Sequence, residues 1–256
     1  MADVEPVLRA VGISKRFGAV RALQDVDLDV YPAEVVGLVG DNGAGKSTLI
    51  KCLAGTGPAD AGEVWFEGRK VALTHPQDAS DLGIATVYQD LALCDNLDVV
   101  ANLFLGQEAR RTRLLDETAM EGEANRLLAS LAVTTLRDVR MPVASLSGGQ
   151  RQSVAIARSL LGSPKLVILD EPTAALGVAQ TAQVLELVRR LRARGLGVIL
   201  ISHNLENVFD IADRIVVLRL GRNVASFDVS NTTQEAVVGA ITGAEFGTPP
   251  GPEVER

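Results

Sequence analysis

The sequence predicts an α/β fold that has a mostly parallel core sheet, an N-terminal antiparallel β subdomain and a helical insert. Two observations predict it. Short apolar runs typical of strands occur in both the first and the last third of the chain, with a long amphipathic stretch between the last two. The middle of the chain is instead rich in Leu, Ala and Arg, with apolar residues at helical spacing. Strands that alternate with helices of this length form parallel sheets, so we expect the helix-rich middle to interrupt one.

The expected strands of the first third differ in how deeply they are buried. Residues 7–13 and 26–30 alternate in polarity, as half-buried strands do. Residues 34–39 form a nearly continuous apolar run, which suits a strand that is covered on both faces. A further run at residues 63–67 ends in a turn at Gly68.

The second half of the chain begins with the helical insert. From about residue 95 to residue 161 the pattern is mostly helical, and we expect an inserted subdomain at roughly residues 92–162. Strand signals return at residues 166–169 and 198–201, separated by an amphipathic stretch at residues 181–194. These two strands complete the expected core sheet.

One domain is expected over residues 5–244, followed by a disordered tail at residues 245–256. The tail contains Pro249, Pro250 and Pro252 between glycines, and these residues deny it ladder hydrogen bonds and a core. We find no internal repeat.

Composition excludes several classes of protein. The 256 residues are 47% hydrophobic, with 25 Lys and Arg against 32 Asp and Glu and a net charge of −7. This is the composition of a globular chain, and its acidity argues against nucleic-acid binding. The densest apolar stretches fall far short of the roughly 18 residues that a membrane-spanning helix needs. The N-terminus carries acids where a secretory signal needs positive charge, so we expect the chain to stay in the cytosol.

The two cysteines, Cys52 and Cys94, have no histidine at metal-ligand spacing. Neither a disulfide scaffold nor a zinc site is supported, and buried free thiols are the expected state.

A glycine-rich segment directly follows the apolar run at residues 34–39 and precedes a stretch that can open a helix. It fits the pattern G-x-x-x-x-G-K-[ST], in the strand-to-helix context which that pattern requires. The glycines let backbone N–H groups turn inward around phosphates, Lys46 would reach the β- and γ-phosphates, and Ser47 would hold Mg²⁺. The predicted ATP-binding residues of this segment are Gly40, Asp41, Asn42, Gly43, Ala44, Gly45, Lys46, Ser47 and Thr48.

A second acidic motif ends the strand expected at residues 166–169. Asp170 would join the magnesium shell, usually through water, and Glu171 would polarise the attacking water. Alone, the segment could equally be a strand that runs into an acidic loop. Together with the glycine-rich loop it predicts only a P-loop NTPase, which would use Mg²⁺; the use of ATP is implied by the resemblance described next.

A third motif lies in the helical insert and comprises Leu146, Ser147, Gly148, Gly149 and Gln150. Ser147 and the glycines at a helix start form a second anion site, although such a segment can also be just a capped helix with a flexible turn. The motif resembles the signature of the ATP-binding cassette (ABC) ATPases. That resemblance implies a head-to-tail dimer, in which the signature of one copy closes on the γ-phosphate held by the P-loop of a second copy.

Three single residues match the same family in the expected order. Gln89 resembles the glutamine that senses Mg²⁺ and links the nucleotide to the membrane partner, His203 the histidine that contacts the γ-phosphate, and Phe17 the aromatic that stacks on adenine. Taken alone, each has a plainer reading: a solvated amide, a structural histidine and a core phenylalanine. The resemblance thus implies catalytic roles for Glu171, His203 and Lys46. It implies metal roles for Ser47, Gln89 and Asp170.

The resemblance extends over residues 7–242 and is strongest, at residues 99–106 and 171–176, to importers of ribose, xylose and fructose. Those importers work with an integral membrane permease and an extracytoplasmic sugar-binding protein, and the ATPase lies peripherally on the cytoplasmic side of the cell membrane. Because this chain has one set of motifs, it must pair with a second copy of itself. One departure is Gly177, which stands where the family usually has an aspartate that couples the two sites.

Two alternatives stay open at this point. One is the ATPase of an exporter for lipids or drugs. The other is a soluble ABC protein that acts on ribosomes or DNA, but such proteins usually carry tandem cassettes, a coiled-coil insert or a basic linker, and none is visible here. The sequence does not name the sugar, because the ATPase does not touch it.

Overall fold

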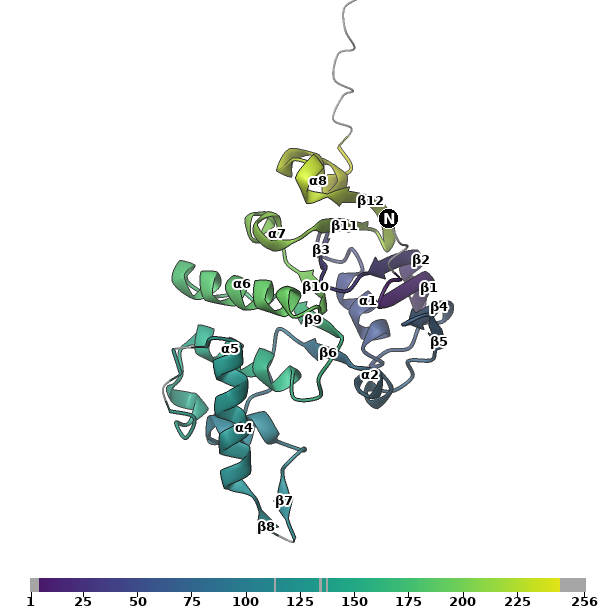
Figure 1. Cartoon of the computed structure of the whole chain (residues 1–256). Helices are drawn as coiled ribbons and strands as arrows, with labels where there is room; N and C mark the ends of the chain where they lie inside the picture. Colours follow the sequence, from purple (N-terminus) through teal and green to yellow (C-terminus); the bar gives the residue numbers. More distant parts are fainter. Residues whose placement is uncertain (1–4, 113, 134, 137, 245–256) are drawn as a thin grey trace, which may run out of the picture.

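The computed structural model describes residues 5–112, 114–133, 135–136 and 138–244. The tail at residues 245–256, expected to be disordered, lies outside the described residues. The described residues form an antiparallel sheet, a larger mostly parallel sheet and an insert built largely of helices (Figure 1). This arrangement confirms the predicted fold class.

The N-terminal sheet has four strands in the order β2-β1-β4-β5. Its strands are β1 (Leu8–Phe17), β2 (Val20–Val30), β4 (Ala61–Phe66) and β5 (Arg69–Val71). All its pairs are antiparallel, as predicted for this subdomain. β1 and β2 extend further toward their shared turn than the polarity pattern indicated, since their polar ends pair through irregular register shifts.

The core sheet has six strands in the order β12-β11-β3-β10-β9-β6. They are β3 (Val35–Val39), β6 (Ile84–Val87), β9 (Leu166–Asp170), β10 (Gly197–Ile201), β11 (Arg214–Arg219) and β12 (Arg222–Asp228). Five of them are parallel, and β12 is antiparallel at one edge. The carboxyl ends of β3, β6, β9 and β10 therefore lie on the same side of the sheet.

Helices connect and cover the strands. They are α1 (Lys46–Leu53), α2 (Pro76–Leu82), α3 (Val99–Phe104), α4 (Glu117–Ser130), α5 (Gly148–Ser159), α6 (Val178–Ala193), α7 (Leu205–Ile211) and α8 (Gln234–Thr242). No helix of the described residues is both long and apolar enough to cross a membrane.

The insert between β6 and β9 contains α3, α4 and α5. It also contains a short hairpin of β7 (Arg110–Arg111) and β8 (Leu114–Leu115), so it is less helical than the composition indicated. In Figure 1 the insert extends away from the sheets, and the hairpin forms its far end.

Alternate residues of the core strands enter two different apolar clusters. On β9, Val167 and Leu169 join the cluster that contains the apolar side chains of the insert and of α6. Leu166 and Ile168 join the cluster of α1 and the N-terminal sheet. Because the sheet is covered on both faces, the strands are apolar throughout, and polar side chains can gather only beyond the strand ends.

Candidate active site

The glycine-rich loop joins the end of β3 to the start of α1. Gly45 is the N-cap of α1 with φ of 108°, and no side chain of the described part of the chain caps this helix. The N–H groups of the first turn have no carbonyl partner within the helix, and the helix dipole adds positive potential there. The start of α1 can therefore bind an anion.

Two of the loop glycines are required by close backbone approach. A Cβ atom on Gly40 would lie 2.2 Å from the carbonyl oxygen of Leu218, and one on Gly45 would lie 2.8 Å from that of Ala22. Both residues also have positive φ. The loop is thus held between β2 and the β11–β12 turn, where the Gly221 N–H donates to the Ala44 carbonyl at 2.9 Å.

Sequence reasoning missed the contribution of the β11–β12 turn to this loop. The available signal was the Leu220-Gly221 turn after an apolar run, but nothing in a sequence pattern says that this turn meets residue 44.

Lys46 turns back over the loop. Its Nζ donates to the carbonyl oxygens of Gly40 at 2.6 Å and Asp41 at 3.0 Å. Partial burial lowers the pKa of Lys46, while the charges of Glu171, Asp41 and Asp170 act in the opposite direction. The lysine therefore lies within electrostatic reach of both predicted catalytic-site acids.

Asp170 is the last residue of β9, and Glu171 follows it in the left-handed region with φ of 52°. The Glu171 N–H donates to the Ile201 carbonyl at 3.0 Å, which holds this strained turn against β10. Burial raises the pKa of Asp170, the charge of Glu171 raises it further, and Lys46 opposes the shift. The two acids and the lysine form one cluster at the carboxyl edge of the sheet.

His203 meets Glu171 from the loop after β10. Its Nδ1 lies 2.8 Å from Glu171 Oε2, and its side chain is 72% exposed whereas that of Glu171 is 15% exposed. The contact has the length of an ion pair, yet Oε2 is buried without a hydrogen-bond partner among the described residues. A buried carboxylate oxygen with no more than this one contact from the described residues is suited to accept a proton from a bound molecule.

Gln89 follows β6, and Phe17 ends β1. Val87 of β6 pairs with Leu169 of β9, so the exposed Gln89 lies just beyond the same edge of the sheet as Asp170. Phe17 ends β1, is 55% exposed and has the Lys15 Nζ 5.7 Å from its ring centroid. The ring is therefore not packed in the core, and it is exposed enough to stack on a ligand.

The third motif begins α5. Ser147 is the N-cap; its Oγ accepts from the Gln150 N–H at 3.4 Å, and its own N–H donates to Gln150 Oε1 at 2.9 Å. Leu146 is buried, while Gly148 and Gly149 pack against Leu176 and Gln180 near the start of α6. No hydrogen bond or ion pair among the described residues joins this motif to the glycine-rich loop.

Gly177 is the N-cap of α6, and its N–H donates to Gln180 Oε1 at 3.2 Å. The neighbouring Val178 is 91% exposed. This loop, with His203 and Asn204, lines a cavity of about 310 Å³.

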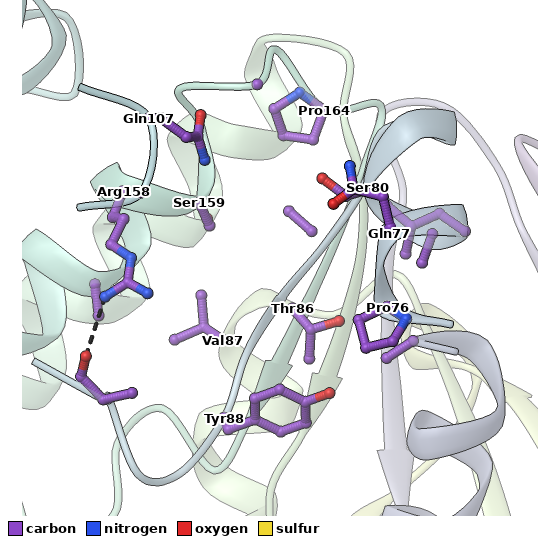
Figure 2. A pocket seen from close by; sticks show the side chains of 18 of the residues that line it. Pro76, Gln77, Ser80, Thr86, Val87, Tyr88, Gln107, Arg158, Ser159 and Pro164 are labelled. Carbon is purple, nitrogen blue, oxygen red and sulfur yellow. Dashed lines mark hydrogen bonds between the residues drawn. The ribbon is translucent and has the colours of Figure 1, made fainter. Parts of the chain in front are cut away.

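A larger groove of about 810 Å³ lies between α2, the end of β6 and the insert. Figure 2 shows Tyr88 and Thr86 on the β6 side, Gln77 and Ser80 from α2, and Arg158 from α5. The Arg158 Nη1 donates to the Ala92 carbonyl at 3.0 Å. Tyr88 and Asp90, which flank Gln89, both line the groove, so it adjoins the acid cluster; the sequence did not predict it.

The residues at the cluster fit Mg²⁺. No three His, Cys, Asp or Glu of the described chain are grouped as a metal cage. Mg²⁺ does not require one, because it keeps waters and binds through one or two protein oxygens together with phosphates. Ser47 at the start of α1 and Asp170 at the end of β9 supply such oxygens.

Both cysteines are free, as predicted. Cys52 is buried, and burial raises the pKa of its thiol to about 11. Cys94 is half-buried rather than fully buried.

A glycine-rich loop that follows a buried parallel strand and opens a helix with a lysine, near an Asp-Glu pair at the same edge of the sheet, defines a P-loop ATPase. A family model described as "ABC transporter" matches residues 23–174. The chain belongs to the ABC transporter family, as one of its ATPases, and the resemblance seen in the sequence is confirmed.

Relatives and solved structures agree with this family. The fructose import ATP-binding protein FrcA of Rhizobium meliloti is 45% identical over 94% of this chain and 95% of its own length. The xylose/arabinose import ATP-binding protein XylG of Sulfolobus acidocaldarius is 45% identical over 92% and 93%. An ATP-binding cassette of an ABC transporter in its ADP conformation superposes with a TM-score of 0.80 at 28% identity, covering 93% of this chain and 96% of that one.

Proposed function

We propose that this chain is the ATP-hydrolysing subunit of an importer that moves a monosaccharide across the cytoplasmic membrane. The observation that carries the proposal is the buried Glu171 Oε2. Its one close polar neighbour among the described residues is His203 Nδ1, and it lies in one cluster with Lys46 and Asp170 beside a helix start that no described side chain caps. That cluster provides an acceptor for a proton of the attacking water and, next to it, a site for the phosphates.

Nucleotide binding would use the loop backbone and one aromatic ring. The free N–H groups at the start of α1 would bind the phosphates of ATP, and Lys46 would exchange its bonds to the Gly40 and Asp41 carbonyls for the β- and γ-phosphates. The exposed ring of Phe17 would stack on adenine, because the N-terminal sheet contacts the loop through Ala22.

Ser47, Asp170 through water, and Gln89 would hold Mg²⁺. When bound there, Mg²⁺ would neutralise charge on the β- and γ-phosphates. The carboxylate of Asp170 also gains from a cation, since burial beside Glu171 disfavours its charged form.

Hydrolysis requires a water molecule aligned with the γ-phosphate. Glu171 would accept a proton of that water at Oε2, and the strained backbone at Glu171 fixes the direction of the carboxylate. The exposed His203 imidazole would contact the γ-phosphate while its Nδ1 stays close to Glu171. Catalysis would be mostly positioning and charge stabilisation.

A second copy of the chain would complete each site. The N–H groups and the Ser147 hydroxyl at the start of α5 would close on the γ-phosphate bound by the other copy, giving a head-to-tail dimer around two ATP molecules. Leu146 would anchor this turn in the core, and Gln150 would cap it.

The transport role is supported by the relatives, which are named as import proteins for fructose and for xylose or arabinose. A galactofuranose transporter ATP-binding protein of Escherichia coli is 41% identical over 95% of this chain, which spans 48% of that relative. An integral membrane permease would dock in the groove beside Gln89 (Figure 2), and an extracytoplasmic sugar-binding protein would deliver the sugar. The chain would thus be peripheral on the cytoplasmic side and would not bind nucleic acid.

The test is Glu171→Gln, which keeps the shape of the side chain and removes the proton acceptor. ATP turnover should fall at least about 100-fold, and light scattering should detect an ATP-bound dimer that the wild-type chain forms only transiently. A variant that is saturated with ATP and stays monomeric, or that retains turnover, contradicts the proposal. Tagged wild-type chain should co-purify a permease and a sugar-binding protein; co-purification of ribosomes or of an exporter instead would contradict the importer role.

A further inference from the structure

The turn between β11 and β12 is strained and closely packed. Its two central residues, Leu220 and Gly221, have φ of 49° and 76°, a combination typical of the tight turns that join paired strands. A leucine rarely takes positive φ, and such strain persists only where the surrounding structure holds it. A Cβ atom on Gly221 would lie 2.7 Å from the carbonyl oxygen of Ala22, so the turn is pressed against β2. The groups that hold the turn are accordingly found on β2.

Gln24 of β2 holds the turn through both its backbone and its side chain. The Gln24 N–H donates to the Gly221 carbonyl at 2.7 Å, and the Gln24 Nε2 donates to the Leu220 carbonyl at 3.4 Å. The Gln24 Oε1 accepts a hydrogen bond at 3.0 Å from Nη2 of Arg222, the residue that follows the turn. The side-chain amide thus contacts the residues on either side of Gly221, and Gln24 and Arg222 act on the turn as a pair.

The same turn fixes one peptide group of the glycine-rich loop. The Gly221 N–H donates to the Ala44 carbonyl at 2.9 Å, and that carbonyl belongs to the peptide group whose N–H is on Gly45. In a planar trans peptide the C=O and the N–H point in opposite directions, so this hydrogen bond directs the Gly45 N–H away from the turn. No described residue accepts a hydrogen bond from the Gly45 N–H. The turn therefore sets the direction of an N–H that is free to meet a phosphate at the start of α1.

We infer that Gln24 and Arg222 are positioning residues for the phosphates of ATP. The pair holds the turn, and the turn keeps the Gly45 N–H directed into the phosphate site, so neither side chain needs to touch the nucleotide. Binding is tighter when donors are already oriented, because less freedom is lost on association. The inference rests on the proposed binding of ATP phosphates by this loop, and it adds two residues that lie outside each of the sequence motifs.

Asn223 provides a matched comparison, because it joins β2 to β12 without contacting the loop. Its Oδ1 accepts from the Asp27 N–H at 2.8 Å, and its Nδ2 donates to the Asp27 carbonyl at 3.0 Å. The side chains of Asn223 and Gln24 thus each make two amide hydrogen bonds at this junction, but among the described residues those of Asn223 do not reach the turn. Replacing either side chain should lower the stability of the fold to a similar degree, whereas only Gln24 should affect the loop.

The experiment measures ATP binding by titration, and the KM and kcat of ATP turnover, for the full chain and its variants. Gln24→Ala and Arg222→Ala should each weaken ATP binding and raise the KM roughly fivefold to tenfold, the range expected when one hydrogen bond is lost. The kcat should change by less than about twofold, because Glu171 and His203 follow β9 and β10 rather than β11. The double variant should bind ATP no more weakly than the weaker single variant, since both substitutions break the same contact.

Asn223→Ala is the control: it should bind ATP like the wild type, while its Tm falls as much as that of Gln24→Ala. Gln24→Glu, which keeps the acceptor for Arg222, should retain most of the affinity. Wild-type affinity in Gln24→Ala, an equal loss in Asn223→Ala, or a fall in kcat alone overturns the inference. A loss in Arg222→Ala that Gln24→Ala does not share would show that Arg222 binds the phosphates directly, and would also overturn it.

Lys46→Ala, measured in parallel, separates a failure of this inference from a failure of the proposed phosphate site. If Lys46→Ala loses ATP binding while Gln24→Ala keeps it, the inference fails and the proposed site stands. If Lys46→Ala also binds ATP like the wild type, the loop does not bind the phosphates through this lysine, and both fail.

Discussion

The starts of α1 and α5 are both glycine-rich, but they are built in different ways. No side chain of the described residues caps α1, whereas Ser147 and Gln150 cap α5 reciprocally. An uncapped start leaves its donors free for a ligand, while a capped start has used part of its donors to stabilise itself. The start of α1 can thus bind an anion within one chain. Under the proposed function, the capped start of α5 instead meets a phosphate that another chain holds.

The glycines of the two segments also have different causes. Gly40 and Gly45 have positive φ and lie against backbone carbonyls. Gly148 and Gly149 lie against the side chains of Leu176 and Gln180, without positive φ. Conformation requires glycine in the first segment, and helix packing favours it in the second. The effects of substitutions should therefore differ: in the first segment they should strain the backbone, and in the second they should disturb helix packing.

Lys46→Ala should give the largest effect, because it removes the cation from the open anion site. ATP turnover should fall by roughly a thousandfold or more. Nucleotide binding, measured by fluorescence titration, should weaken strongly. Lys51→Ala, on the exposed side of the same helix, is the control and should retain both properties. Equal losses in the two variants would show that the loop does not bind phosphate through Lys46.

Gly40→Ala should come next, because the added Cβ would lie 2.2 Å from the Leu218 carbonyl. We expect the free energy of unfolding, measured with urea, to fall by several kcal/mol. ATP binding, measured by titration, should also be lost. Gly43→Ala is the matched control: its φ is 78°, but nothing lies within 4 Å of the new atom, so it should cost only about 1 kcal/mol. Similar costs for both would mean that β11 does not confine the loop.

These glycines show which features can be predicted from the sequence and which cannot. The loop, the acids at the end of β9 and the buried strands β3, β9 and β10 were predictable, because each depends on a local pattern: a fixed spacing of glycine and lysine, or a continuous apolar run. β11 was not expected, although residues 215–218 form such a run. β6 was not predicted, because a strand of four residues that contains Ala85 and Thr86 has no clear polarity pattern. The support of residues 40 and 44 by the β11–β12 turn was not predictable either, since it joins segments about 180 residues apart.

The residues proposed for catalysis show the same division between local pattern and tertiary packing. The sequence placed Glu171 and His203 at the ends of two separate strands, and the parallel pairing of β9 with β10 makes them neighbours. The burial of Oε2 and the positive φ of Glu171 depend on tertiary packing, which no sequence pattern predicts.

Ser147→Ala should have a smaller effect that separates the two helix starts. Loss of the cap should lower the folding free energy by about 1 kcal/mol, while ATP binding to the single chain should stay unchanged because α1 is intact. Turnover should fall roughly tenfold or more, since the variant lacks a donor to the phosphate of the other copy. Calorimetry measures the folding free energy, titration measures ATP binding, and an ATPase assay measures turnover. Weakened ATP binding by the isolated chain would mean that α5 contributes within one copy.

Asp170→Asn should have the smallest effect on folding, and with the opposite sign. Because burial and Glu171 raise the pKa of Asp170, its contribution to stability is complete below the ordinary carboxyl pKa and is lost as the pH rises through the raised value. At neutral pH the charged side chain therefore opposes folding. Removing it should stabilise the nucleotide-free chain slightly, which thermal unfolding would detect as an increase in Tm.

That gain should shrink as the pH falls toward about 4, where the aspartate of the unfolded chain also becomes protonated. The same variant should need more Mg²⁺ for turnover, since it lacks the carboxylate next to the metal site. Asp90→Asn, an exposed acid just beyond Gln89, should change neither property. If Asp170→Asn destabilised the chain at neutral pH, Asp170 would be a structural anchor. If it stabilises the chain while slowing turnover, the charged Asp170 lowers the stability of the folded chain but is needed to bind Mg²⁺ with ATP. The uncapped start of α1 is a parallel case, because it leaves N–H groups free to bind the phosphates of ATP.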